Sequence, residues 1–384
     1  MRRAFIAVAL IFTGCAPVVV PASTTPSSSP SANTTAAASP TVAASPTVAA
    51  TSSPTATSDP GRYGYVLPSA GRIVVRAERS NSVDRVIAVG GEQPSASPDG
   101  KRIAFWRTGP QGNNPQELRI VDVPGGVEQM LSSIPVGFIG GPIVWSSDGT
   151  GLLYAIQSSE LFPGAGGGPR SSRLFSFDMS ATPPEGATDS QLMLSSGSWF
   201  VPLSWDKAGL LATALVTGEG GMSQNYVTWD RHVQPAGQSA VKFTRFPWAV
   251  VAFTVQASPD AKRLLAIDGA ANVLRIWPAG DLAAAGMVGP GAAVISDARW
   301  RPGAPGDIAW VIDQNVGVFT YQTSSSGIIH RGQATVRIMA WRPDGSGLVL
   351  TELGRGEFVV EMSSGQSTAL SGFGGLIAGA VLLR

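Results

Sequence analysis

The sequence predicts an all-β protein: a seven-bladed β-propeller, with a six-bladed ring as the alternative, behind a disordered N-terminal tether. A short turn phrase recurs six times within residues 61–384 at blade-sized spacing. Strand-like segments accompany the copies, and no helix of useful length is visible. Residues 16–60, in contrast, lack the large apolar side chains that a core requires.

Residues 1–14 are predicted to be a lipoprotein signal peptide. Arg2 and Arg3 precede nine apolar residues, which at about 1.5 Å per residue span roughly half of a hydrocarbon core, too little for a transmembrane helix. The tetrapeptide that ends at Cys15 resembles the lipobox of bacterial lipoproteins, although Phe12 stands where Leu is usual. The resemblance implies that Cys15 is lipidated and holds the protein on the extracytoplasmic side of the membrane, in the cell envelope. An ordinary secretory peptide with an incidental cysteine is the alternative.

Residues 15–60 are predicted to be the lipidated cysteine and a disordered linker. The 45 residues after Cys15 include 19 Ser or Thr, 11 Ala and 8 Pro, and one hexamer is repeated at 39–44 and 45–50. A flexible coil of that length has a root-mean-square span of roughly 35 to 40 Å, and an extended one reaches about 140 Å. We therefore expect a tether, and its Ser, Thr and Pro content also permits O-glycosylation.

The repeated phrase is typical of a tight turn between two strands. In its fullest form it reads Ser-Pro-Asp-Gly, in which Pro fixes φ at the second turn position and Gly closes the reversal. The copies open at Ala96, Trp145, Trp205, Ala257, Trp300 and Trp341. Their spacings of 49, 60, 52, 43 and 41 residues are those of propeller blades.

Each copy is expected to lie between the first two of four strands, as a propeller blade requires. First strands are expected at 142–145, 294–300 and 336–341, and second strands at 103–106 and 348–352. Third strands are expected at 118–123, 174–178, 226–230, 273–277, 316–321 and 357–361. Fourth strands are expected at 127–131, 191–194, 241–246 and 328–330.

The two ends of residues 61–384 are expected to meet in one blade. Three strands, at 63–67, 72–77 and 85–89, precede the first turn phrase without a first strand of their own. The apolar segment 375–383 can supply that strand, so that it joins the strands of 62–90 and hides both sheet edges. A membrane-touching tail is the alternative for this segment.

The repeat Ser-Pro-Asp-Gly-Lys-Arg-Ile-Ala-Phe at 97–105 resembles the TolB-type, WD-like propeller repeats of many bacterial periplasmic and surface proteins. The resemblance covers residues 61–384 and implies the fold, but no single function, because such repeats serve many roles. An α/β domain as in TolB and a hydrolase domain as in prolyl peptidases are both missing from this sequence, so we expect neither role to carry over.

Composition excludes several classes of function. With 27 basic and 26 acidic residues and a net charge of +1, the chain is not expected to bind nucleic acid. Two His and one Cys cannot build a zinc cluster, and no metal or cofactor is expected. Nucleophile-elbow, Walker and calcium-loop motifs are missing, so no catalytic residue is assigned, and a non-catalytic role is favoured over an enzyme.

The residues that recur in register are interpreted as structural. Carboxylates recur in the turn phrases, where capping of the turn explains them better than a binding array; they are Asp99, Asp148, Asp260 and Asp344. Trp145, Trp205, Trp300 and Trp341 are expected to pack between blades. His232 and His330 lie at strand ends beside an Arg and are expected to be structural or solvated.

Residues that break the register predict a binding rim. Long loops between second and third strands occur in the early repeats and open onto the same side as the connections between blades. Aromatic and Arg side chains gather in that sector, a composition typical of binding hot spots. The predicted binding residues are Phe138, Phe162, Arg170, Trp199, Phe200, Arg245, Phe246 and Trp248. The alternative is that several of these aromatic residues begin inner strands and are buried.

Three functions are consistent with the sequence. We favour a lipid-anchored extracytoplasmic propeller that binds a protein or glycan through this aromatic rim. One alternative is a propeller enzyme (a hydrolase, lyase or dehydrogenase) that acts in the central funnel. The other is a scaffold in envelope assembly.

Overall fold

The computed structural model describes residues 62–69, 71–78, 84–108, 116–123, 125–159, 172–180, 185–190, 198–206, 209–217, 223–230, 244–245, 254–278, 281, 286–288, 294–304, 306–370, 373 and 377–383. In several strands between 185 and 288 it describes the backbone alone. The predicted signal peptide, Cys15 and the linker lie outside the described residues. Within the described part, no helix is long and apolar enough to cross a membrane.

The described strands form seven four-stranded antiparallel sheets. The first sheet has the order β28 (Gly379–Leu382), β1 (Tyr63–Ser69), β2 (Arg72–Ala77), β3 (Arg85–Val89). The second holds β4 (Gly91–Ala96), β5 (Arg102–Arg107), β6 (Glu117–Asp122) and β7 (Gln129–Ser133). The third holds β8 (Phe138–Trp145), β9 (Gly151–Ser158), β10 (Ser172–Asp178) and β11 (Glu185–Ser190). The fourth holds β12 (Ser198–Asp206), β13 (Gly209–Thr217), β14 (Ser223–Asp230) and β15 (Thr244–Arg245).

The last three sheets repeat the same up-and-down order along the chain. The fifth holds β16 (Gln256–Ala257), β17 (Arg263–Asp268), β18 (Val273–Pro278) and β19 (Gly286–Val288). The sixth holds β20 (Ile295–Trp300), β21 (Asp307–Ile312), β22 (Asn315–Thr320) and β23 (Ser325–Arg331). The seventh holds β24 (Val336–Trp341), β25 (Gly347–Glu352), β26 (Gly356–Glu361) and β27 (Ser367–Ala369).

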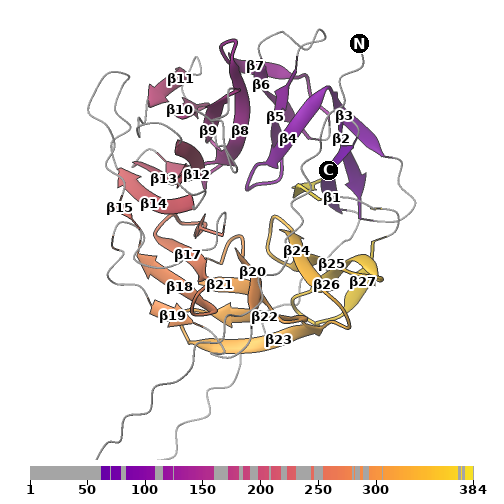
Figure 1. Cartoon of the computed structure of the whole chain (residues 1–384). Helices are drawn as coiled ribbons and strands as arrows, with labels where there is room; N and C mark the ends of the chain where they lie inside the picture. Colours follow the sequence, from indigo (N-terminus) through magenta and orange to yellow (C-terminus); the bar gives the residue numbers. More distant parts are fainter. Residues whose placement is uncertain are drawn as a thin grey trace, which may run out of the picture. The chain divides into compact units, whose positions relative to one another are not determined.

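The sheets stand side by side around a central axis, as Figure 1 shows. The first strands β4, β8, β12, β16, β20 and β24 contact one another in turn, and β28 contacts both β24 and β4. This arrangement is that of an all-β propeller. The C-terminal strand β28 pairs with β1, with Tyr63 opposite Leu382 and Val66 opposite Gly379, which is the pairing expected from the sequence.

The core lies between neighbouring sheets, because each sheet buries its apolar residues against the next. One cluster joins the second and third sheets through Trp106, Trp145 and Tyr154. Another joins the seventh and first sheets through Val349, Tyr65 and Phe373. Most second strands are apolar nearly throughout, as in β9, because they are covered on both faces.

One predicted strand is displaced in the structure. The fourth strand of the third sheet is β11, Glu185–Ser190, whereas the sequence predicts it at 191–194, which lies outside the described residues. The prediction was based on the apolar residues at 191–194, but the strand that forms has the polar sequence Glu-Gly-Ala-Thr-Asp-Ser. An outer strand pairs on one side alone, so it requires backbone pairing more than apolar side chains.

Candidate functional site

The repeated turns define one face of the propeller, which we call the turn face. In three of them the Ser hydroxyl donates to the Asp Oδ1 two residues later at 2.6 Å, namely in the pairs Ser97 and Asp99, Ser146 and Asp148, and Ser258 and Asp260. The same Oδ1 accepts the backbone N–H of the residue after the Gly or Ala position, at 2.9 to 3.2 Å. These carboxylates therefore cap their turns, as the sequence predicts.

Two of the turn carboxylates, Asp99 and Asp148, have a lowered pKa. Burial alone would raise the pKa of Asp99 and Asp148, but the hydrogen bonds from the serine hydroxyls and backbone N–H groups outweigh it. The pKa of each is lowered from its ordinary value. Asp99 and Asp148 are therefore ionised at neutral pH.

The recurrent tryptophans join adjacent sheets. Trp145 Nε1 donates to the carbonyl of Ser95 at 3.0 Å, and Trp300 Nε1 donates to the carbonyl of Gln256 at 3.4 Å. Trp341 is buried in the same register, whereas the side chain of Trp205 lies outside the described residues. For the three that are described, packing between blades is confirmed.

A central cavity of about 810 Å³ opens among the first strands. Its wall includes residues from β4, β8, β12, β16, β20, β24 and β28, together with five of the six turn phrases. Several Trp and Pro residues line it, and its charged lining residues are Asp99, Asp148, Asp260 and Arg299. A volume of this size lies within the range of ligand sites.

The opposite side of the ring, which we call the loop face, carries the sheet connections. On this face the residue that follows a second strand donates its backbone N–H to the carbonyl of the residue that precedes a first strand. Four such bonds are present, at 2.8 to 3.4 Å: Thr108 to Gly90, Ser159 to Gly137, Asp313 to Val294 and Leu353 to Thr335. These bonds show that the loops after the second strands and the sheet connections share one face. That grouping is the one on which the predicted binding rim depends.

The predicted rim residues differ in their structural settings. Phe138 is half-buried at the start of β8, and the guanidinium of Arg173 lies 5.2 Å from its ring centroid. Phe200 is 1% exposed in β12, so it packs in the interior and cannot contact a partner; its inclusion in the rim is wrong. Four of the remaining six lie outside the described residues; they are Phe162, Arg170, Phe246 and Trp248. Trp199 and Arg245 lie in strands β12 and β15, where their side chains are not described.

His330 on β23 is hydrogen-bonded to a buried carboxylate. Its Nε2 lies 3.3 Å from Glu352 Oε2, and the Glu352 side chain is 4% exposed. Glu352 Oε1 also accepts the backbone N–H groups of Gln333 and Ala334 at 2.5 and 3.2 Å. These contacts hold the connection from the sixth to the seventh sheet, which agrees with the prediction that His330 is structural. His232 lies outside the described residues.

The stability of this connection is expected to depend on pH. The N–H groups of Gln333 and Ala334, with His330, hold the pKa of Glu352 below its usual range. A carboxylate with a lowered folded-state pKa stabilises the fold above its unfolded pKa of about 4.3, and this contribution is lost as pH falls through the folded-state value. Glu352→Gln should therefore lower the free energy of unfolding by about 1 kcal/mol at pH 7, and the deficit should disappear below about pH 4.

Urea unfolding of both proteins from pH 7 to pH 3 measures this difference. Both should carry His330→Asn, so that the imidazole does not contribute its own titration. A deficit that stays constant across this range would show that Glu352 acts through packing rather than through its charge.

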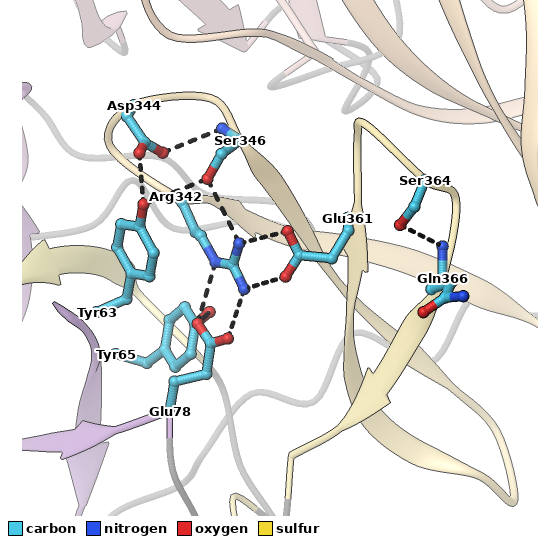
Figure 2. Close-up of polar contacts among 9 residues, drawn as sticks. All are labelled: Tyr63, Tyr65, Glu78, Arg342, Asp344, Ser346, Glu361, Ser364 and Gln366. Carbon is cyan, nitrogen blue, oxygen red and sulfur yellow. Dashed lines mark hydrogen bonds and ion pairs between the residues drawn. The ribbon is translucent and has the colours of Figure 1, made fainter. Parts of the chain in front are cut away.

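The most buried charge cluster joins the seventh and first sheets, and Figure 2 shows it. Arg342 is fully buried and bonds two carboxylates: Nε to Glu78 Oε2 at 3.0 Å, and Nη2 to Glu361 Oε1 at 2.6 Å. The Tyr65 hydroxyl donates to Glu78 Oε2 at 2.6 Å, and the Tyr63 ring lies 4.6 Å from the guanidinium. Since Arg342 is not accessible to solvent, the cluster connects the two sheets and does not serve as a binding site.

The environment keeps this cluster charged. Burial alone would lower the pKa of Arg342, but its hydrogen bonds with Glu361 and Glu78 raise it above the ordinary value. Burial also raises the pKa of Tyr65, so its hydroxyl stays a neutral donor. The sequence analysis missed this cluster. The available signal was that Arg342 occupies the turn position where three other copies of the phrase have Ser.

Comparisons with known proteins identify the fold alone. No family model matches the chain, and no curated protein matches it. An oligogalacturonate lyase in complex with manganese is 12% identical with a TM-score of 0.54, over 75% of this chain and 81% of that one. The β-propeller domain of the Trilobed protease from Pyrococcus furiosus is 14% identical with a TM-score of 0.52, over 82% of this chain and 96% of that one. TolB from Acinetobacter baumannii is 15% identical over 80% of this chain and 62% of that one, with a TM-score of 0.40.

Propellers with different activities therefore share this architecture, and the fold assigns none of them to this chain. What the sequence, the sheet topology and these structures establish together is that the chain is an all-β propeller.

Proposed function

We propose that the chain is a lipid-anchored, non-catalytic binding protein of the cell envelope, in which the seven sheets are the blades of one ring and the loop face recognises a protein. The observation that carries this proposal is a set of exposed aliphatic side chains on the loop face. Its members come from several sheets; they are Val89, Val136, Ile139, Val294 and Leu353. Aliphatic contacts of this kind favour a protein surface over a glycan.

The third sheet offers the densest part of this surface. Val136 is 80% exposed and Ile139 is half-exposed, and both flank Phe138 with its stacked Arg173. The backbone N–H of Ser159 donates to the carbonyl of Gly137 at 2.8 Å, so the end of β9 lies beside Val136. An apolar centre with arginine beside it is the composition of an interface hot spot.

The attachment point of the chain supports this orientation. Arg62, the first described residue, accepts the backbone N–H of Leu383, and Leu382 in turn donates to Gly100 of a repeated turn. The chain therefore enters the propeller at the turn face. A tether from a lipidated Cys15 would therefore be connected to the propeller on that side.

Site-specific photo-crosslinking in living cells tests the proposal. A crosslinking residue at Val136 should capture a discrete partner, whereas one at Val127, which is 92% exposed beside the turn face, should not. Because the partner is expected to contact the aromatic rim, Phe162→Ala, Trp199→Ala and Trp248→Ala together should abolish the Val136 crosslink without changing the melting temperature. Cys15→Ser should release the protein from the membrane fraction and lose acyl labelling.

The same crosslinked proteins at Val136 and Val127 would contradict recognition by the loop face. A crosslink that survives in the triple variant would show that the three aromatic residues pack inside the fold and do not contact the partner.

A further inference from the structure

Arg173 is a cation without a carboxylate partner on the loop face. It lies near the start of β10, is half-buried, and its guanidinium carbon lies 5.2 Å from the ring centroid of Phe138. Among the residues that the structure describes, none forms a hydrogen bond or an ion pair with this guanidinium. The five N–H donors of the side chain are therefore not used within the described part of the fold.

Other arginines of the second and third strands are neutralised within the fold. Arg107 Nη2 lies 2.5 Å from Glu128 Oε1, and Arg275 Nη2 lies 2.7 Å from Asp268 Oδ2. Arg173 differs from them because its charge is not compensated by any described carboxylate.

The Phe138 ring holds the guanidinium at the surface of the third sheet. A guanidinium over an aromatic face is attracted by the quadrupole of the ring, and this attraction uses none of its N–H donors. The strand register supports the placement: Phe138 pairs with Ser158 in β9, and Arg173 pairs with Ile156, so that both side chains lie on one face of the sheet. The guanidinium is thus positioned before a partner binds, which lowers the entropic cost of pairing with it.

A protein that covers the exposed aliphatic residues of the third sheet also removes water from Arg173. Val136 and Ile139 are 80% and 45% exposed, and Phe138 with its guanidinium lies between them. Burying a charge without a counter-charge costs free energy, so a wholly apolar partner surface does not fit. A carboxylate fits best, because its two oxygens accept parallel N–H bonds from one guanidinium.

We propose that the partner of the loop face presents an acidic side chain, Asp or Glu, flanked by apolar side chains, and that Arg173 selects it by pairing with its carboxylate. This inference rests on the proposed function and adds the chemistry of the partner segment. Val136 and Ile139 supply the apolar contacts, and Arg173 supplies the charge that distinguishes an acidic segment from a neutral one.

The Val136 photo-crosslink in living cells, measured in the full chain with Arg173 variants, tests the pairing. Arg173→Glu should lower the crosslink yield about tenfold or more, because two carboxylates would then face each other. Arg173→Gln should lower it severalfold, since the amide keeps donors but no charge. Arg173→Lys should retain part of the yield, because it keeps the charge and loses the parallel N–H bonds.

Mass spectrometry of the captured partner supplies the second arm. The crosslinked segment should contain an Asp or Glu within a few residues of the crosslinked position. Changing that acidic residue to Lys should lower the yield with the wild-type chain and restore it with Arg173→Glu. A purely structural role of Arg173 would not produce this restoration, because it depends on the charges of both partners.

Arg331→Glu is the matched control. Arg331 ends β23 on the loop face of the sixth sheet, is exposed, and forms no ion pair with any described residue. The same charge reversal there should leave the Val136 yield unchanged. Equal losses in Arg331→Glu and Arg173→Glu would show a general attraction between the loop face and an acidic surface, which overturns selection by Arg173.

The remaining outcomes separate this inference from the proposed function. A Val136 crosslink that persists in Arg173→Glu, or a crosslinked segment without an acidic residue, overturns the pairing and leaves recognition by the loop face intact. If the wild-type chain gives no crosslink at Val136 beyond those at Val127, the proposed function fails and the pairing fails with it. Should Arg173→Glu lower the melting temperature, Arg173→Gln and the Lys variant of the partner against wild type still decide the question.

Discussion

Replacing Arg342 with methionine is expected to lower the free energy of unfolding by about 3 to 5 kcal/mol. The guanidinium is fully buried between Glu78 and Glu361, and methionine fills part of its volume without neutralising either carboxylate. Glu78 would then be left buried with the Tyr65 hydroxyl as its remaining side-chain donor. Urea unfolding of the full chain, followed by tryptophan fluorescence, measures this loss.

A double-mutant cycle provides the control. Adding Glu78→Gln to Arg342→Met removes the unpaired buried charge, so the double variant should be more stable than Arg342→Met alone. Because Arg342 joins the seventh sheet to the first, hydrogen exchange in the single variant should rise first in β1 and β28. A loss below about 1 kcal/mol would show that the cluster contributes little to ring closure.

Replacing Trp106 with alanine is expected to cost about 3 to 5 kcal/mol. The ring is buried between the second and third sheets, donates Nε1 to the carbonyl of Gly141 at 2.8 Å, and packs edge-on against Tyr154 with centroids 5.5 Å apart. Alanine would leave a cavity and an unsatisfied carbonyl together. Thermal and urea unfolding should both show the loss.

Enlarging the residue that faces Trp106 tests the same contact. A Cβ added at Gly140 would lie 2.2 Å from Cδ2 of Trp106, so Gly140→Ala forces the indole to move and should destabilise the protein by about 1 to 3 kcal/mol. Combining Gly140→Ala with Trp106→Ala should cost less than the sum of the two. Additive costs would mean that the two residues do not contact each other in solution.

The turns could be predicted from the sequence because their information is local. A tight turn forms wherever Pro, Asp and Gly follow one another at fixed offsets, largely independently of the surrounding residues. In the first copy the backbone N–H of Gly100 donates to the carbonyl of Ser97, and the Ser97 hydroxyl donates to Asp99. Most third strands were predicted to within a residue or two, as β18 and β26 show. Strand β11 was misplaced because an outer strand has no buried face to mark it.

The assignment of individual side chains to site or core required the tertiary structure. Phe138 and Phe200 look alike in the sequence, yet one is half-buried at the loop face and the other is enclosed. The difference depends on which neighbouring sheet covers each ring, and that neighbour is distant in sequence.

The sequence by itself determined that this protein is a repeat of short strands joined by capped turns, because turn chemistry and strand periodicity act over a few residues. Only the tertiary structure decided which charges are buried and which line a cavity. Arg342 meets Glu78 across 264 residues of chain, and Asp99, Asp148 and Asp260 reach one cavity from three sheets. Ring closure creates both arrangements, because it brings the last sheet against the first and places the first strands around one axis.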